Sequence, residues 1–560
     1  MNRSCIAPYN DSSRAASACA TQEMPELDAP AQARLVAALL ASAGLGQDRL
    51  RVRLLETHVS YVLLTGEFAY KIKKALALGF LDFTRLDARR FYCEEELRLN
   101  RRLAPRLYLD VVAITGKPEA PAIGGSGPAL EYAVKMREFP QDALASRALA
   151  RGELAHRDID ALALEVAAFH GSIAVAGQRG AFGLPEEVLR TALQNFAQIR
   201  PLLASEAESA DIDELERWTS REQAARAAAM LRRRQGGFVR ECHGDLHLGN
   251  IALIDAQPVI FDCIEFNRQM RWIDVMSEVA FTIMDLEDRG RRDLAHRFLN
   301  AYLELTGDYH GLNVLRFYLV YRAMVRAKVA RMRAAQLNEA GARQAALAEY
   351  AGYVALAKRH ARPSRPALII THGLSGCGKT TLSQALLEMT GAVRIRTDVE
   401  RKRIVGVEAE TRRKPGIDSG LYSPQATQWT YGSIIESARA AVDGGYVAIV
   451  DAAFLKRWQR DLFRKLAAEL RVPFGIIAFE AGEATLRRRI EVRQRAGHDA
   501  SDADLAVLEH QLRSREPLAP EELADAAAYD AEAPLAEARS PSRWRAVLHR
   551  LEQIERPCSA

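Results

Sequence analysis

The sequence has few cysteines, almost no net charge and no long apolar run. Its seven cysteines are odd in number and include no C-x-x-C pair, which argues against a disulfide framework or a zinc site and fits reduced thiols in the cytoplasm. Lys and Arg exceed Asp and Glu by only 77 to 72, which disfavours a nucleic-acid partner. No apolar stretch approaches the roughly 18 residues of a membrane span, and residues 1–25 lack the apolar core of a signal peptide. We expect a cytoplasmic protein without a membrane partner.

The chain of 560 residues is too long for one hydrophobic core. Short β-like runs come first and a mostly helical region follows from Leu144, whereas strands and helices alternate beyond the linker Arg362–Pro366, as in a doubly wound parallel sheet. The basic run Arg232–Arg234 is typical of a solvated helix face. The expected parts are a disordered lead (1–26), a bilobal domain (27–360), an α/β domain (361–520) and a loose tail (521–560).

A first phosphate-chemistry motif is the run His243-Gly-Asp245-Leu-His247-Leu-Gly-Asn250, with Asp262 at the end of the next strand. The spacing of these acids and the amide is that of a kinase catalytic loop. Asp245 is the candidate base for an acceptor hydroxyl, and Asn250 and Asp262 are candidate Mg²⁺ ligands, since their side chains offer oxygen. Glu265 could assist the metal or form a structural salt bridge, and we expect structural hydrogen bonds from His243 and His247.

The motif also requires a phosphate-binding lysine on an earlier strand and a glutamate on the next helix to hold it. Lys71 follows Ala69 on the expected third strand, and Lys73, on the same face, is the alternative. Of the three consecutive acids Glu94–Glu96, we select Glu96, because Leu99 and Leu103 continue its helix face toward the core.

These residues make 27–360 resemble the aminoglycoside phosphotransferase and choline kinase group of small-molecule kinases. The resemblance implies an α+β protein-kinase-like bilobal fold, with the inter-lobe hinge at 134–139. The chain departs from protein kinases because Thr57-His-Val-Ser60, and no G-x-G-x-x-G loop, precedes Lys71.

The second motif is a complete P-loop, Gly373-Leu-Ser-Gly-Cys-Gly-Lys-Thr380, between an apolar strand and a helix. Glycines let backbone N–H groups face phosphates at a helix N-terminus, Lys379 reaches the β- and γ-phosphates, and Thr380 ligates Mg²⁺. The candidate ATP-binding residues are Gly373, Ser375, Gly376, Cys377, Gly378, Lys379, Thr380 and Thr381.

Two acids and two arginines extend this second site. Asp398 ends the next expected strand, at the edge where ligands of open α/β sheets bind. Asp451 follows a buried strand as a metal-binding carboxylate, or alternatively caps the next helix. Arg489 and Arg493 share one helix face and suit a lid that neutralises the transferring phosphoryl group, although a basic solvated face is the alternative.

This half resembles P-loop kinases of the gluconate kinase, polynucleotide kinase and zeta-toxin type. That resemblance implies that Asp398 orients or deprotonates the acceptor, with Arg401 near the substrate. As a whole, residues 27–515 resemble bacterial two-domain fusions of an aminoglycoside phosphotransferase-like domain and an ATP-binding domain.

The sequence therefore predicts a phosphotransferase with two ATP- and Mg²⁺-dependent sites that act on hydroxyls of small molecules. Two alternatives are a regulatory protein in which only the P-loop half is active, and a nucleic-acid end kinase. The residues name neither acceptor and leave the oligomeric state open.

Overall fold

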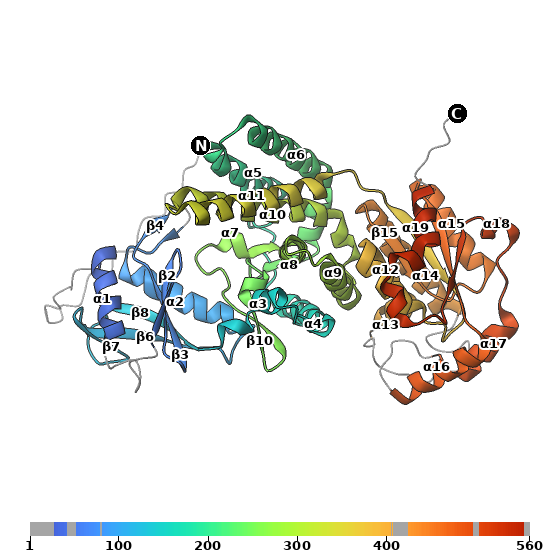
Figure 1. Ribbon diagram of the computed structural model, residues 1–560, viewed down its shortest axis with the longest axis horizontal. Helices are drawn as coiled ribbons and strands as arrows, with labels where there is room; N and C mark the ends of the chain where they lie inside the picture. The colour runs from blue at the N-terminus through green and yellow to red at the C-terminus, as the bar shows by residue number, and fades with distance from the viewer. Residues whose placement is uncertain are drawn as a thin grey trace, which may run out of the picture. The chain divides into compact units, whose positions relative to one another are not determined.

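The structure is a computed structural model that describes residues 27–41, 52–78, 81–404, 406, 424–496 and 503–553 (Figure 1). The expected disordered lead, 1–26, lies outside the described residues. The chain forms two compact units, the first made of 1–97 with 109–138 and the second of 98–108 with 139–560.

The first unit contains a six-stranded sheet with the strand order β1-β2-β3-β8-β6-β7. Apolar residues of helix α1 (Ala29–Ala41) and of the sheet form its core, including Leu35, Ile72 and Ile114. The predicted β-rich lobe is confirmed. The strands are β1 (Arg53–Glu56), β2 (Ser60–Leu64), β3 (Phe68–Lys73), β6 (Tyr108–Lys117), β7 (Ala120–Ile123) and β8 (Glu131–Arg137), and helix α2 (Leu86–Asn100) follows β3 and the short pair β4 (Ala77–Leu78) and β5 (Leu81–Asp82).

The second unit begins with the predicted helical lobe. Its central helix, α8 (Val275–Asp288), is buried from Val275 to Glu287. Two small antiparallel strand pairs interrupt the helices: the hairpin of β10 (Ile251–Ile254) with β11 (Gln257–Ile260), and the pair of β9 (Val239–Glu241) with β12 (Trp272–Asp274), between which that hairpin lies in the sequence. The other long helices are α4 (His156–Ser172), α5 (Pro185–Ile199), α6 (Glu206–Gln235), α9 (Arg292–Thr306), α10 (Leu312–Gln336) and α11 (Ala340–Ala361).

The basic run at the end of α6 is not a solvated face, so that expectation was wrong. The Arg233 guanidinium is 4% exposed and lies between two carboxylates, with bonds of 2.7–2.8 Å to Asp274 and Asp308. Arg234 donates to the carbonyl oxygens of Phe182 and Gln178. Partners distant in sequence therefore bury two of these charges.

Beyond the linker, five strands pair in parallel in the order β14-β15-β13-β16-β17. In the central strand β13 (Ala367–His372), Leu368 and Ile370 belong to one hydrophobic core and Ile369 to another, so both faces of the sheet are covered (Figure 1). The predicted doubly wound sheet is confirmed. Its other elements are β14 (Val393–Arg396), β15 (Val447–Asp451), β16 (Phe474–Glu480), α12 (Lys379–Thr390), α13 (Thr397–Ile404), α14 (Pro424–Asp443), α15 (Arg457–Leu470), α16 (Glu483–Ala496) and α17 (Leu505–Ser514).

The expected loose tail after 520 instead completes this sheet. Strand β17 (Ala526–Asp530) pairs with β16 along its whole length. Trp544 is fully buried and stacks on Tyr529 with 4.2 Å between ring centroids, and helix α19 (Arg545–Gln553) follows. The tail is therefore part of the α/β domain. In the part of the chain that is described, no helix is both long and apolar enough to traverse a bilayer.

Candidate active sites

The lysine–glutamate pair predicted from the first motif lies in the first unit. Lys71 Nζ on β3 is 2.8 Å from Glu96 Oε1 on α2, as predicted, and Lys73 Nζ is 2.7 Å from Glu96 Oε2. Burial alone would raise the pKa of the Glu96 carboxyl, but the two lysines lower it to about 2. Lys71 is 12% exposed and Lys73 only 1%, so Lys71 is the better placed to meet a ligand.

The catalytic-loop residues lie in the second unit, around the β10–β11 hairpin. Asn250 Nδ2 donates to Asp245, at 3.0 Å to the backbone oxygen and 3.1 Å to Oδ2. Because Ile251 pairs with Ile260, the residues before and after the hairpin are neighbours, and Phe261 N–H donates to the Asn250 carbonyl. The hairpin therefore brings Asp262, which follows β11, close to Asn250, which precedes β10.

Asp262 has a left-handed backbone, with φ at 66°, and its N–H donates to Tyr108 Oη at 3.1 Å. Aspartate is among the few residue types that adopt this region, and residues held there cluster at functional sites. The conformation turns the chain sharply after β11, which supports a functional task for the carboxylate.

The Asp245 carboxylate is held in its charged form. Burial alone would raise the pKa of Asp245, but His247, with Nε2 at 3.4 Å from Oδ2, and His243 hold it well below its ordinary value. His243 has a structural task as predicted, since its Nε2 lies 2.8 Å from the Phe261 carbonyl and its Nδ1 accepts the Asp245 N–H.

Glu278 on α8 anchors this loop, and the motif analysis missed it. Its carboxylate accepts the His243 N–H at 3.1 Å and the Gly244 N–H at 2.7 Å. Burial alone would raise the pKa of Glu278, but His170, His243 and the Gly244 N–H lower it to about 2. The available signal was a single acid within the apolar run Val275–Phe281.

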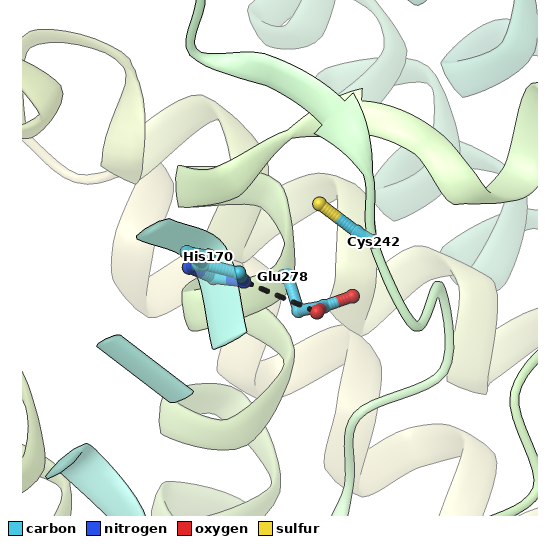
Figure 2. A group of neighbouring side chains, drawn as sticks. All are labelled: His170, Cys242 and Glu278. Carbon is cyan, nitrogen blue, oxygen red and sulfur yellow. Dashed lines mark hydrogen bonds and ion pairs between the residues drawn. The ribbon is translucent and has the colours of Figure 1, made fainter. Parts of the chain in front are cut away.

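His170, Cys242 and Glu278 present nitrogen, sulfur and oxygen within 4.8 Å of one another, a donor set that could suit zinc (Figure 2). These groups already have other partners, however. His170 bonds Glu278 at 3.2 Å and Tyr302 Oη at 2.9 Å, and the Cys242 thiol lies 3.6 Å from the Ile273 carbonyl. Burial also raises the pKa of Cys242, which disfavours the thiolate that zinc requires. We interpret the group as a hydrogen-bonded support of the catalytic loop.

The P-loop has the backbone that its motif requires. Gly376 and Gly378 both have φ at 88°, and a Cβ on Gly376 would lie 2.8 Å from the Leu486 carbonyl oxygen, so a side chain is excluded there. Gly378 is the N-cap of α12. The loop thus leads into the N-terminal end of a helix, where anions bind.

The lysine, threonine and aspartate predicted for the P-loop site contact the loop or one another. Lys379 Nζ is 3.0 Å from the carbonyl oxygens of Gly373 and Leu374, which places the ammonium group over the loop. Thr380 Oγ1 donates to Asp451 Oδ2 at 2.6 Å. Since α15 begins at Arg457 with Lys456 as N-cap, Asp451 does not cap that helix. These oxygens suit Mg²⁺.

The predicted lid arginines contact carbonyl oxygens. Arg489 bonds those of Cys377, at 3.3 Å, and Ala531, at 2.8 Å, so it lies beside the P-loop, whereas Arg493 bonds that of Ala503 at 2.6 Å. Gln511 on α17 was not predicted, and its Oε1 accepts the Ser375 N–H at 2.8 Å. The Gln511 side chain therefore accepts a backbone N–H of the P-loop that the motif would direct toward phosphate.

Asp398 lies in the first turn of α13, directly after β14. Helix α14 packs against α13. Burial raises the pKa of Tyr431 on α14, and the charges of Arg401 and Asp398 lower and raise that pKa, respectively. Trp458, 54% exposed, lies 5.4 Å from the Tyr431 ring. Arg401 lies one turn after Asp398 on α13, and the aromatic pair Tyr431 and Trp458 lies on α14 and α15.

Comparison with known proteins agrees with this division. Residues 81–315 match the model of the phosphotransferase enzyme family, and residues 368–518 match that of an AAA domain. Uncharacterised proteins of Mycobacterium tuberculosis and Mycobacterium bovis are 29% identical over 459 residues, which cover 81% of this chain and 88% of theirs.

Solved structures resemble the two parts separately. A gluconokinase from Sinorhizobium meliloti 1021 is 24% identical and covers 34% of this chain and 95% of its own, with a TM-score of 0.24. A choline/ethanolamine kinase family protein from Mesorhizobium loti is 12% identical and covers 59% of this chain and 98% of its own, with a TM-score of 0.35. These similarities are too weak to carry a function. By its family matches, the chain combines a phosphotransferase-enzyme-family domain, matched over 81–315, with an AAA domain, matched over 368–518.

Proposed function

We propose that this protein is an ATP-dependent phosphotransferase with two nucleotide sites, each of which transfers the γ-phosphate to a hydroxyl of a small molecule. The observation that carries the proposal is that polar side chains of each motif are bonded to one another. In the catalytic loop, Asn250 Nδ2 donates to Asp245 Oδ2, and in the P-loop site Thr380 Oγ1 donates to Asp451 Oδ2. The seven cysteines without paired spacing favour work in the cytoplasm.

In the first domain, the bilobal domain of 27–360, Asp245 is charged and accepts the proton of the acceptor hydroxyl. Asn250 fixes the orientation of the Asp245 carboxylate. Asn250 and Asp262 are the metal ligands, and the Lys71–Glu96 pair binds phosphate. In the P-loop domain, Lys379 binds the phosphates, Thr380 and Asp451 hold the metal, and Asp398 aligns the acceptor. Bound Mg²⁺ would neutralise the negative charge of the phosphates at both sites.

The test is a transfer screen with radiolabelled ATP over sugars, aminoglycosides, choline, nucleosides and DNA ends. Asp262→Ala should remove labelling of one acceptor and Lys379→Ala that of another, because each variant disables one site. Labelling that only Lys379→Ala abolishes would favour a regulatory first domain, and labelling of DNA ends would favour an end kinase. A wild-type chain that labels nothing and binds no Mg·ATP would refute the proposal.

A further inference from the structure

Strand β14 lies at the edge of the P-loop sheet, and an edge strand leaves a row of backbone groups without a strand partner. Here helix α9, which belongs to the first domain, covers that edge. Asn300 Nδ2 donates to the Ala392 carbonyl at 3.0 Å, and Arg394 N–H donates to Asn300 Oδ1 at 2.8 Å. In a parallel ladder, one residue likewise donates to residue i and accepts from residue i+2. The buried Asn300 amide therefore imitates a sixth parallel strand.

Two more residues of the first domain hold the same edge. Tyr309 Oη, just after α9, donates to the Arg394 carbonyl at 3.3 Å. Glu304 Oε1 accepts from Arg394 at 3.1 Å to Nε and 2.7 Å to Nη2. Burial alone would raise the pKa of Glu304, but Arg394 and Arg396 lower it, so the pair is ionic.

Arg394 also bonds Thr380, the last residue of the P-loop motif. Its Nη1 donates to the Thr380 carbonyl at 2.7 Å, in the first turn of α12, and the Thr380 hydroxyl in turn bonds Asp451. The strand that Asn300 holds runs directly into α13 and Asp398. One helix of the first domain thus supports both the predicted metal ligand and the predicted acceptor-orienting acid of the second.

Buried apolar side chains also connect the two domains. One continuous cluster of buried side chains contains Phe298 of α9, Leu315 of α10, Ile370 of β13 and Ile395 of β14. The helical lobe and one face of the P-loop sheet therefore have a common core.

We propose that Asn300 and Glu304 are positioning residues of the P-loop site, so that the first domain is a structural part of the second domain's active site. This proposal rests on the proposed function of the P-loop half. It implies that α9 contributes to binding and turnover at that site as well as to stability.

Arg297 provides a matched control on the same helix. It bonds Glu388 Oε1 at 2.7 Å and Asp160 Oδ1 at 2.7 Å. Glu388 lies near the far end of α12, about 13 Å along the helix from Lys379 at 1.5 Å per residue. Arg297→Gln therefore weakens the contact between α9 and α12 and removes no direct bond of Arg394 or β14. Gln384, which bonds both Glu388 Oε1 and Arg394 Nη2, keeps both partners in this variant.

The experiment uses the full chain with Asp262→Ala, which disables the first site, and measures Mg·ATP binding by calorimetry together with the melting temperature. Glu304→Gln and Asn300→Asp keep side-chain size but remove, respectively, the charge facing Arg394 and the donor to Ala392. We expect each to weaken Mg·ATP binding about 10–100-fold, the range for residues that support metal ligands. Because Thr380 is a predicted metal ligand, the loss should be smaller for ATP in EDTA.

The control variant distinguishes a positioning role from a purely stabilising one. Arg297→Gln should lower the melting temperature comparably and leave Mg·ATP affinity unchanged. Wild-type affinity in Glu304→Gln and Asn300→Asp, or an equal loss in Arg297→Gln, would overturn the proposal. If the Asp262→Ala parent binds no Mg·ATP, or if its binding survives Lys379→Ala, the proposed function of the P-loop half fails and this inference falls with it.

Discussion

The anchoring of the catalytic loop by Glu278 makes the sharpest prediction. Glu278→Gln keeps the side chain's size, but an amide has one acceptor oxygen where the carboxylate has two. The carboxylate accepts the N–H groups of both His243 and Gly244, so one buried donor loses its acceptor. An unsatisfied buried donor costs about 1–3 kcal/mol.

The ionisation of Glu278 gives a second estimate of the same order. Its pKa is lowered from 4.5 to about 2, which corresponds to about 3 kcal/mol of stability at neutral pH. Because the folded pKa is lower than the unfolded one, this stabilisation is fully present above about pH 5. It is lost as the pH falls from the unfolded value toward 2.

The assay is urea unfolding of wild type and Glu278→Gln at several pH values, with transfer activity of the first site measured in parallel. We expect the variant to be about 2–3 kcal/mol less stable at pH 7, with the difference shrinking below about pH 4.5. Glu287→Gln is the matched control, since Glu287 also lies on α8 but bonds His360 at 2.7 Å, away from the loop. It should lower stability and leave activity unchanged. A difference for Glu278→Gln under about 0.5 kcal/mol, or one independent of pH, would refute the anchoring role.

Substitutions at three residues test single roles at the two sites. Asp245→Asn should lower first-site turnover about 10²–10⁴-fold with ATP affinity retained, and equal loss of affinity would contradict its role as base. Asp398→Asn should keep ATP binding and melting temperature but remove transfer at the P-loop site, and wild-type transfer would make Asp398 a structural residue. Gln511→Glu should weaken ATP binding, because it puts a negative charge on the Ser375 N–H, whereas Gln511→Ala should not, and calorimetry distinguishes the two outcomes.

The element types and the two motifs were predictable because both depend on local sequence. Apolar periodicity identified the helices and strands, and spacing identified Asp245, Asn250, Lys379 and Thr380. The pairing of Lys71 with Glu96 also followed from helix periodicity and is confirmed.

The features that were missed depend on partners far away in the sequence. Strand β17 has the sequence Ala-Ala-Ala-Tyr-Asp, whose alanines favour helix, and it is a strand because β16 offers an edge to pair with. Arg233 is buried because Asp274 and Asp308 surround it. Asn300 has no local signal, since its task is set by the edge of a strand in another domain.

The two sites also differ in what their backbones can offer to phosphate. In the catalytic loop, N–H groups donate within the protein, those of His243 and Gly244 to Glu278, that of Leu248 to Asp285 at 2.9 Å and that of Gly249 to His247 at 3.0 Å. These four N–H groups therefore already have acceptors within the protein. In the P-loop, the N–H groups of Gly373, Ser375 and Cys377 also donate within the protein. The motif predicts that the other N–H groups of the loop and Lys379 contact phosphate directly.

Removal of Mg²⁺ should consequently affect the two sites differently. In a Lys379→Ala chain, where only the first site remains, EDTA should abolish ATP binding, because Asn250 and Asp262 act on phosphate through the metal. In an Asp262→Ala chain, the P-loop site should bind ATP more weakly in EDTA but still measurably, since Lys379 and the loop backbone contact phosphate directly. Calorimetric titration of both chains with and without EDTA makes the comparison. Equal dependence on Mg²⁺ in the two chains would contradict this division, and it would show that the P-loop site also binds ATP chiefly through Thr380 and Asp451.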